Sequence, residues 1–185
     1  RRLFRGLTPE RVAIIGGGIA GLWNAIAHGI IFSQIRHQFG RSLFKYQAIN
    51  HTLGDLYARA AAYTSFAFNI ADMYDKRVGH KIHKGENPDP MDEQYIAILA
   101  AQGKYLIAKL SHFAAYEIVQ TMGGRGAIDE PGSSNAINRL ENLSRIQEVI
   151  GGHRNIQMMI INAGLKGTSA MAGIGSNIKR AKRAK

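Results

Sequence analysis

The stretch from Thr8 to Gly40, TPERVAIIGGGIAGLWNAIAHGIIFSQIRHQFG, decides the fold. Its first residues favour the start of a helix, because Thr8 can cap, Pro9 suits the first helical position and Glu10 complements the helix dipole. Apolar residues then recur with little polar interruption as far as Ile35. We therefore expect one long, mostly buried helix that starts at Thr8.

The same stretch also matches a dinucleotide-binding fingerprint, with Gly16, Gly18 and Gly21 at G-x-G-x-x-G spacing. That motif needs a strand-turn-helix unit and an acidic residue about 20 positions further on, which binds a ribose. The sequence has no Asp or Glu between Glu10 and Asp55. The missing acidic residue therefore argues against a Rossmann fold. The small residues instead favour close approach of another helix or a ligand.

Two further long helices are predicted from three-and-four spacing of apolar residues. The first runs from Leu43 to Tyr74, and the polar segment Gly79 to Pro90, with His80 and His83, is interpreted as a solvated loop. The second begins at Asp89-Pro90 and is stopped by Gly123-Gly124.

The remaining sequence predicts a loop over residues 127–136 and helices from about Ile137 to Ile150 and from about Arg154 to Leu165. Long helices joined by short or polar loops are typical of an all-α antiparallel four-helix bundle, here with an extra C-terminal helix. We place this bundle at residues 1–165, followed by a basic flexible tail at 166–185.

Composition limits the classes of function. The 185 residues contain no cysteine, which excludes disulfides, thiolate metal sites and a cysteine nucleophile. No uninterrupted apolar run reaches the roughly 18 residues of a membrane span, so we expect an intracellular protein without one. The net charge of +11 suggests a polyanionic partner, either nucleic acid or a phosphorylated ligand, although the basic tail is more simply a solvated segment. The seven histidines lack the spacing of a metal site.

Five short motifs occur in an order that resembles the carboxy-terminal domain of the acyl-CoA dehydrogenases. They lie between about Thr8 and Ala163. The motifs are Glu10-Arg11 at a helix start, Arg36 to Gly40 at the end of the first helix, Gln47 early in the second, Gln120 to Gly124 at the end of the third, and Gly152 to Gln157 as a turn into the last. Each is weak alone, but the ordered set is specific.

The resemblance implies an FAD enzyme that removes hydrogens from the α and β carbons of an acyl-CoA thioester. In the family, a glutamate takes the α proton and the β hydrogen leaves as hydride to the flavin. An electron-transfer flavoprotein then accepts the electrons. The family also implies a homotetramer built as a dimer of dimers, located in the cytoplasm or, in a eukaryote, in the mitochondrial matrix.

The resemblance also assigns roles to individual residues. Arg11 would lie near the CoA side of the substrate. His153 and Asn155 stand where the family usually has a hydroxyl and an amide against the flavin. The residues that would touch the FAD of a neighbouring subunit are Arg36, Gln38, Phe39, Tyr46, Gln47, Gln120, Met122, Gly123 and Gly124.

The position of the catalytic base follows from a complementary pair of residues. Most family members carry the base immediately before the glycine of the final turn, where this chain has Gly151. A smaller set, similar to the long-chain and isovaleryl enzymes, supplies it from the first helix, where Glu10 stands. We therefore expect Glu10 to be the base, with the Gly151 backbone N–H binding the thioester oxygen. The missing side chain at Gly151 favours a long or branched acyl chain.

Structural interpretations of these residues stay open. Glu10 could simply complement the dipole of its helix, and Arg11 could pair with a nearby carboxylate. Arg36 could be a charge at the C-terminal end of a helix, and Phe39 could belong to the core. Asn142-Leu143 replaces the usual Arg-Asp pair. The family's amino-terminal helical and middle β domains are missing from the chain, so we expect a fragment that binds FAD weakly alone. Other functions are a flavin oxidase or monooxygenase and a non-catalytic module that binds polyanions.

Overall fold

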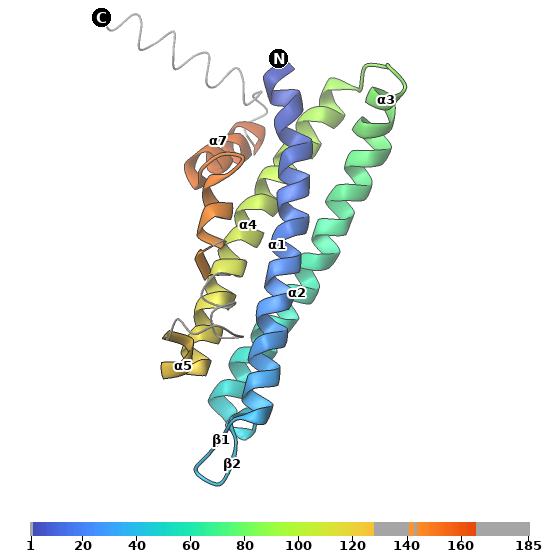
Figure 1. Cartoon of the computed structure of the whole chain (residues 1–185). Helices are drawn as coiled ribbons and strands as arrows, with labels where there is room; N and C mark the ends of the chain where they lie inside the picture. The colour runs from blue at the N-terminus through green and yellow to red at the C-terminus, as the bar shows by residue number, and fades with distance from the viewer. Residues whose placement is uncertain (1, 128–140, 143, 166–185) are drawn as a thin grey trace, which may run out of the picture.

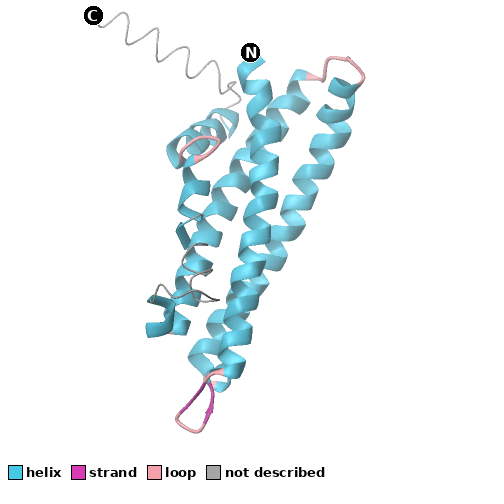
Figure 2. Ribbon diagram, in the orientation of Figure 1, coloured by secondary structure: helices cyan, strands magenta, loops and turns pink. Residues whose placement is uncertain are grey.

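Three long helices form the body of the molecule. The computed structural model describes residues 2–127, 141–142 and 144–165. Helices α1 (Arg2–Ile35), α2 (Gln47–Tyr74) and α4 (Pro90–Met122) lie side by side and alternate in direction (Figure 1). The chain then returns along α4 through α5 (Gly124–Ala127) and the helical residues 144–149, and α7 (Arg154–Leu165) packs on α4. The predicted all-α class is confirmed, since helix dominates the described residues (Figure 2).

The start of α1 differs from the prediction. The helix begins at Arg2, and Pro9 lies inside it. A proline in a helix cannot donate the usual backbone hydrogen bond, but the residues before it can still adopt helical geometry. Thr8, Pro9 and Glu10 are therefore not a helix start, and no acidic residue lies in the first turn. The interpretation of Glu10 as a charge that only complements the dipole at the helix start is wrong.

A short hairpin connects α1 to α2. Strand β1 (His37–Gln38) pairs antiparallel with β2 (Arg41–Ser42), and the 3₁₀ turn η1 (Leu43–Lys45) leads into α2. The two residues between the strands, Phe39 and Gly40, both have positive φ angles, of 50° and 80°. This is the pattern of a type I′ turn, in which a residue such as Asn usually stands where Phe39 does.

The polar segment after α2 is not wholly a loop. A π-helical turn, η2 (Asp75–Gly79), continues the helix, and α3 (His80–His83) adds one more turn. The predicted loop position of His80 and His83 is wrong, because the wider backbone hydrogen bonding of η2 carries the helix past Gly79. By contrast, the bounds of α4 are confirmed. Asp89 caps its start by accepting a hydrogen bond from Met91 N at 2.8 Å.

The core lies along the seam of α1, α2 and α4. One cluster at the end of the bundle near the hairpin combines buried residues of all three helices: Leu22, Ala25, Ile26, Leu53, Leu56, Ala60, Leu110, Ala114, Ile118 and Met122. A second cluster, Ile15, Ile70, Ala100 and Ile107, continues it toward the other end. Ile160 and Ile161 of α7 are buried with Ala101 of α4.

The glycine-rich segment of α1 is a packing feature. Residues 16–21 lie within the continuous helix, which confirms the argument against a Rossmann turn. A Cβ atom on Gly18 would meet Ile107 and Ser111 of α4, whose hydroxyl donates to Gly18 O at 3.0 Å. Nothing lies within 4 Å of such an atom on Gly16 or Gly21. Only Gly18 among these three allows the predicted close approach of another helix.

Helix α1 is also apolar enough, over Leu7–Ile35, to pass a test for membrane-spanning helices by length and composition. Only 33% of the tested window is buried, so the prediction of a mostly buried first helix is wrong, although α1 contributes Ile15, Leu22 and Ile26 to the core. Of the predicted loop at 127–136, Ala127 is instead the last residue of α5, and 128–136 lie outside the described residues. The start of the predicted helix at 137–150, Leu143 and the tail at 166–185 also lie outside them.

Candidate functional site

The turn before α7 is built on two glycines in left-handed backbone conformations. Gly151 has a φ of 70° and Gly152 a φ of 108°, in the region that side chains disfavour. We call these two residues the glycine turn. The Gly152 N–H donates to Val149 O at 3.2 Å, whereas the Gly151 N–H has no acceptor within the described part of the chain. Among the described residues, the Gly151 N–H is therefore unpaired.

Glu10 of α1 lies beside this turn. A Cβ atom built on Gly151 would be 3.9 Å from Glu10 Oε1 and 2.8 Å from Ile14 Cδ1. The Glu10 carboxylate thus borders the space that a side chain at 151 would enter. Glu10 is exposed, and the structure brings together the two residues that the sequence predicted to be complementary.

Arg11, the next residue on α1, points into the molecule. Its side chain is buried, with 2% of its surface exposed, and its Nε donates to Gly151 O at 3.3 Å. Burial lowers the pKa of Arg11, and the charge of Glu10 partly opposes this effect. The structure adds a contact that the sequence did not predict, because Arg11 supports the glycine turn.

Two further buried residues hold the glycine turn. Gln157 of α7, fully buried, donates from Nε2 to Gly151 O at 3.0 Å and to Gly152 O at 2.8 Å. Lys104 of α4, 2% exposed, donates from Nζ to Glu148 O at 2.9 Å and to Gly152 O at 2.7 Å. Gln157 belongs to the motif from Gly152 to Gln157 in the sequence. Lys104 was not predicted, because nothing in the sequence distinguishes it from the other residues among the 24 Lys and Arg.

His153 begins α7. Its carbonyl accepts from Ile156 N at 2.8 Å, and its ring Nδ1 accepts from Asn155 N at 3.4 Å. The imidazole therefore stands in the place of an N-capping side chain. Both His153 and Asn155 are exposed, so their side chains remain accessible.

The hairpin carries a second group of predicted site residues. Phe39 is 93% exposed, so the interpretation of this residue as core is wrong. The Tyr46 hydroxyl donates to Gln38 O at 2.8 Å, and the Arg41 guanidinium lies 4.0 Å from the centre of the Tyr46 ring. Arg36 and Gln47, at the ends of this segment, are exposed. We call residues 36–47 the hairpin tip.

The end of α4 supplies the other predicted contacts. Gly123, with a φ of 61°, donates to Gln120 O at 3.1 Å and ends the helix. Gln120 and Gly124 are exposed, whereas Met122 is 7% exposed and packs in the core. A ligand at this end would therefore meet the backbone of Met122 more readily than its side chain.

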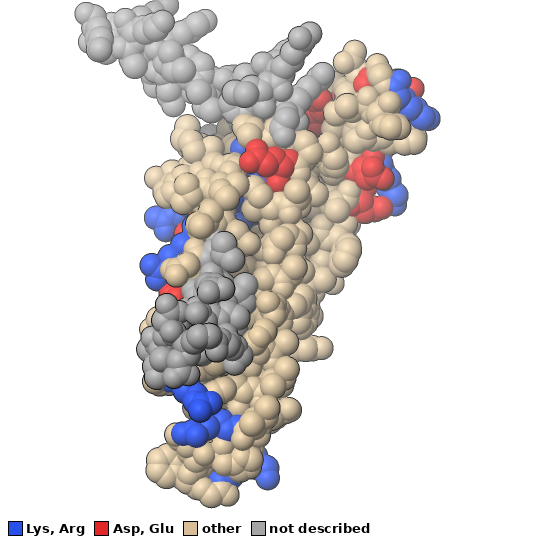
Figure 3. Space-filling view, in the orientation of Figure 1, with Lys and Arg blue, Asp and Glu red and all other residues tan. Residues whose placement is uncertain are grey.

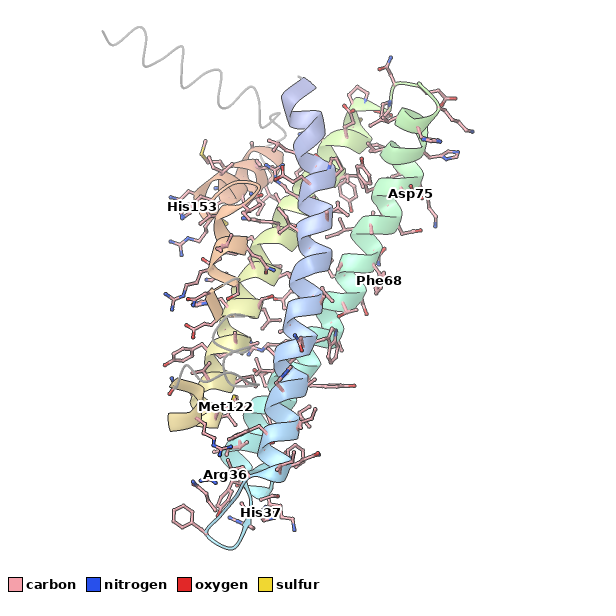
Figure 4. All side chains as sticks on the ribbon, in the orientation of Figure 1. Arg36, His37, Phe68, Asp75, Met122 and His153 are labelled. Atoms are coloured by element: carbon pink, nitrogen blue, oxygen red, sulfur yellow. The ribbon has the colours of Figure 1, made fainter. Side chains whose placement is uncertain are left out.

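The predicted residues form two groups at different ends of the bundle (Figure 4). Arg36, His37 and Met122 lie toward the hairpin tip, and His153 lies toward the other end. Glu10 and Ile35 are separated by about 38 Å along α1, at 1.5 Å per residue. Figure 3 shows Lys and Arg side chains near the hairpin tip on this face, where the described residues show no acidic one beside them.

Comparison with known proteins identifies the family. The model of the acyl-CoA dehydrogenase C-terminal domain matches residues 1–166. The 2-methylacyl-CoA dehydrogenase of Solanum tuberosum is 26% identical over 159 residues, which are 86% of this chain and 34% of that protein. The isovaleryl-CoA dehydrogenase of Pongo abelii is 28% identical over 78 residues, 42% of this chain and 18% of that protein.

A solved structure shares the fold. The glutaryl-CoA dehydrogenase from Mycobacterium smegmatis, in complex with FADH2, has a TM-score of 0.71 at 18% identity and covers 88% of this chain. The matched part is 37% of that protein, so the chain spans about a third of the length of such relatives. The chain belongs to the acyl-CoA dehydrogenase family and carries its C-terminal domain.

Proposed function

We propose that this domain acts in the α,β-dehydrogenation of acyl-CoA thioesters, with Glu10 as the base that takes the α proton. One observation carries the proposal: Glu10 Oε1 lies 3.9 Å from the position of a Cβ atom on Gly151. The carboxylate therefore borders the position of a side chain at residue 151, the residue whose N–H is unpaired among the described residues. A base and an oxyanion donor on the same small surface suit removal of a proton next to a carbonyl.

The two groups divide the chemical work. The Gly151 N–H binds the thioester oxygen and stabilises the negative charge that develops there when the α proton leaves. The exposed Glu10 carboxylate accepts that proton, and an acyl chain closing over it excludes water and strengthens it as a base. Residue 151 has no side chain, and a long or branched acyl chain beside Glu10 would need Ile14 Cδ1, which is 2.8 Å from the position of a Cβ atom on Gly151, to move aside.

The hairpin tip and the end of α4 fit FAD. The exposed ring of Phe39 offers a flat apolar surface, and exposed Arg36 and Arg41 offer positive charge for a pyrophosphate. Gln120 and Gly124, also exposed, add an amide and accessible backbone. Bound FAD supplies the two-electron acceptor for the reaction. Since these residues lie far from Glu10, the cofactor they hold belongs to a neighbouring subunit in the proposed arrangement.

The same proposal includes partners and location. Two separate groups of site residues in one domain favour a homo-oligomer, which we propose to be a dimer of dimers. We propose an electron-transfer flavoprotein as the electron acceptor, on family analogy. The two relatives compared above are named as mitochondrial, which supports the mitochondrial matrix if the source is a eukaryote. In a bacterium we propose the cytoplasm.

The test uses the full-length protein that carries this chain, with FAD bound, under anaerobic conditions. Long and branched acyl-CoAs should bleach the flavin absorbance of the parent. Glu10→Gln, which keeps the shape but not the charge, should slow bleaching by at least about 100-fold while FAD stays bound. Glu86→Gln, at an exposed glutamate of the α3–α4 connection, is the matched control and should bleach like the parent.

The other outcomes are equally informative. Equal bleaching by Glu10→Gln and the parent would place the base elsewhere. A parent that no acyl-CoA bleaches would reject acyl-CoA as the substrate, and rapid reaction of the reduced flavin with oxygen would favour an oxidase.

A further inference from the structure

Lys104 is a buried cation whose hydrogen-bond partners are backbone carbonyls. Its Nζ lies between Glu148 O, at 2.9 Å, and Gly152 O, at 2.7 Å. Glu148 belongs to the last turn of the helical residues 144–149, where carbonyls lack partners within the helix. One ammonium thus joins the end of this helix to the second residue of the glycine turn.

This arrangement carries an electrostatic cost. Burial lowers the pKa of Lys104, the positive charge of Arg11 lowers it further, and only Glu148 acts in the opposite direction. A buried apolar side chain of similar length would avoid that cost. Packing alone therefore does not explain a cation at this position. The hydrogen bonds to two backbone carbonyls do, because an apolar side chain could not donate them.

The two carbonyls that Lys104 and its neighbours hold are those of Gly151 and Gly152, which directly follow the unpaired Gly151 N–H in the chain. Gly151 O accepts from Arg11 and Gln157, and Gly152 O accepts from Lys104 and Gln157. These donors come from α1, α4 and α7, so each long-range contact fixes the glycine turn against a different helix. With its carbonyls turned inward, the glycine turn keeps Gly151 in the left-handed conformation, and its N–H stays unpaired within the described residues.

We propose that Lys104 is a positioning residue that holds the glycine turn so that the Gly151 N–H meets the thioester oxygen beside Glu10. The inference rests on the proposed function and deepens it. Lys104 touches no reacting atom and acts through the backbone of Gly152 and Glu148. Its loss should therefore impair turnover more than substrate binding, because a small displacement of an oxyanion donor affects the transition state most.

The test compares variants of the full-length protein with FAD bound. Lys104→Met removes the donors and keeps the length of the side chain. Lys104→Arg keeps them, and a small cavity beside Lys104, lined also by Ala108 and Gln157, gives room for the larger group. Lys109→Met, at an exposed lysine of the same helix, is the matched control.

Two readouts separate positioning from general stability. The first is amide hydrogen exchange of residues 148–157, which Lys104→Met should accelerate by about 10- to 100-fold, as expected for a lost hydrogen bond to a charged group. The second is steady-state kinetics, in which kcat should fall by about 10- to 100-fold while KM changes less than about threefold. Lys104→Arg should keep most of the exchange protection and most of the kcat of the parent. Lys109→Met should match the parent in both quantities.

Several results would overturn the inference. These are unchanged exchange at residues 148–157, exchange that rises equally across α4 and α7, or faster local exchange with unchanged kcat. If Lys104→Met does not fold, Lys104→Gln, which is shorter and uncharged, replaces it with the same expectations. A parent without acyl-CoA activity would reject the proposed function, whereas the exchange experiment would still decide whether Lys104 holds the glycine turn.

Discussion

A Cβ atom on Gly18 would lie 2.5 Å from Cγ2 of Ile107, so α1 and α4 touch at a point where only glycine fits. Cγ2 is bonded to the branched Cβ of Ile107 and has little freedom to move away in a helix. Ser111 donates to Gly18 O one turn further along α4. The position of α1, and with it the position of Glu10, depends on this contact.

Gly18→Ala should therefore destabilise the protein. The steric cost of overpacking, about 1–3 kcal/mol, exceeds the gain in helix propensity, so we expect the free energy of unfolding to fall by about 1–2 kcal/mol. Urea unfolding followed by circular dichroism measures this change. Gly21→Ala is the control: nothing lies within 4 Å of its new Cβ, and the free energy of unfolding should rise by about 0.5–1 kcal/mol. A stabilising Gly18→Ala would contradict the contact.

The glycine turn leads to a second prediction. Gly151→Ala places a side chain at a φ of 70° and a Cβ atom 2.8 Å from Ile14 Cδ1. We expect a loss of about 2–3 kcal/mol in the free energy of unfolding. Ile14→Val removes Cδ1, so the double variant should lose about 1 kcal/mol less than the sum of the single variants. Strict additivity in a double-mutant cycle would show that Ile14 does not limit residue 151.

The hairpin tip leads to a third prediction, about the role of Phe39 in FAD binding. Phe39 is exposed and has a φ of 50°, which glycine adopts more easily. Phe39→Gly should therefore leave the free energy of unfolding unchanged or slightly higher while FAD affinity in the full-length protein falls roughly tenfold, as for loss of an aromatic contact. Met91→Ala, at an exposed apolar residue near the other end of the bundle, should change neither quantity. Unchanged FAD affinity in Phe39→Gly would remove Phe39 from the cofactor site.

Lys104 leads to a prediction about pH. Its pKa is lowered in the folded state, so between that pKa and the unfolded value near 10.4 the unfolded chain binds more protons. The free energy of unfolding attributable to Lys104 should therefore rise with pH in that window. Urea unfolding at several pH values up to about 10 would show a smaller rise, or a steeper fall, in Lys104→Met than in Lys109→Met. Identical pH profiles for the two variants would contradict the lowered pKa.

The sequence predicted best those elements whose signals are local. Asp89 followed by Pro90 marks the start of α4, and the Gly123-Gly124 pair marks its end, because a cap and a left-handed glycine act within one turn. The predicted start of α1 was wrong because a local signal can mislead. Thr8, Pro9 and Glu10 are typical of a helix start, but the helix already begins at Arg2. His80 and His83 were misplaced because a π-helical turn has no simple sequence signature.

The candidate site was predictable only in part. Glu10 and Gly151 are 141 positions apart in the sequence, and the ordered motifs alone linked them. Lys104 escaped notice because its role comes from burial and from two carbonyls of another segment, neither of which a sequence pattern displays. Met122 was predicted for the site from its place in a motif, although its side chain faces the core.

The separation of Glu10 from the hairpin tip has a genetic consequence under the proposed arrangement. A subunit with Glu10→Gln still offers an intact hairpin tip to its neighbour, and a subunit with Phe39→Gly still offers an intact base. In mixed assemblies, some cofactor sites would combine an unmutated Glu10 from one subunit with an unmutated hairpin tip from its neighbour. Two alleles that are each impaired alone could thus complement each other when expressed in the same cell.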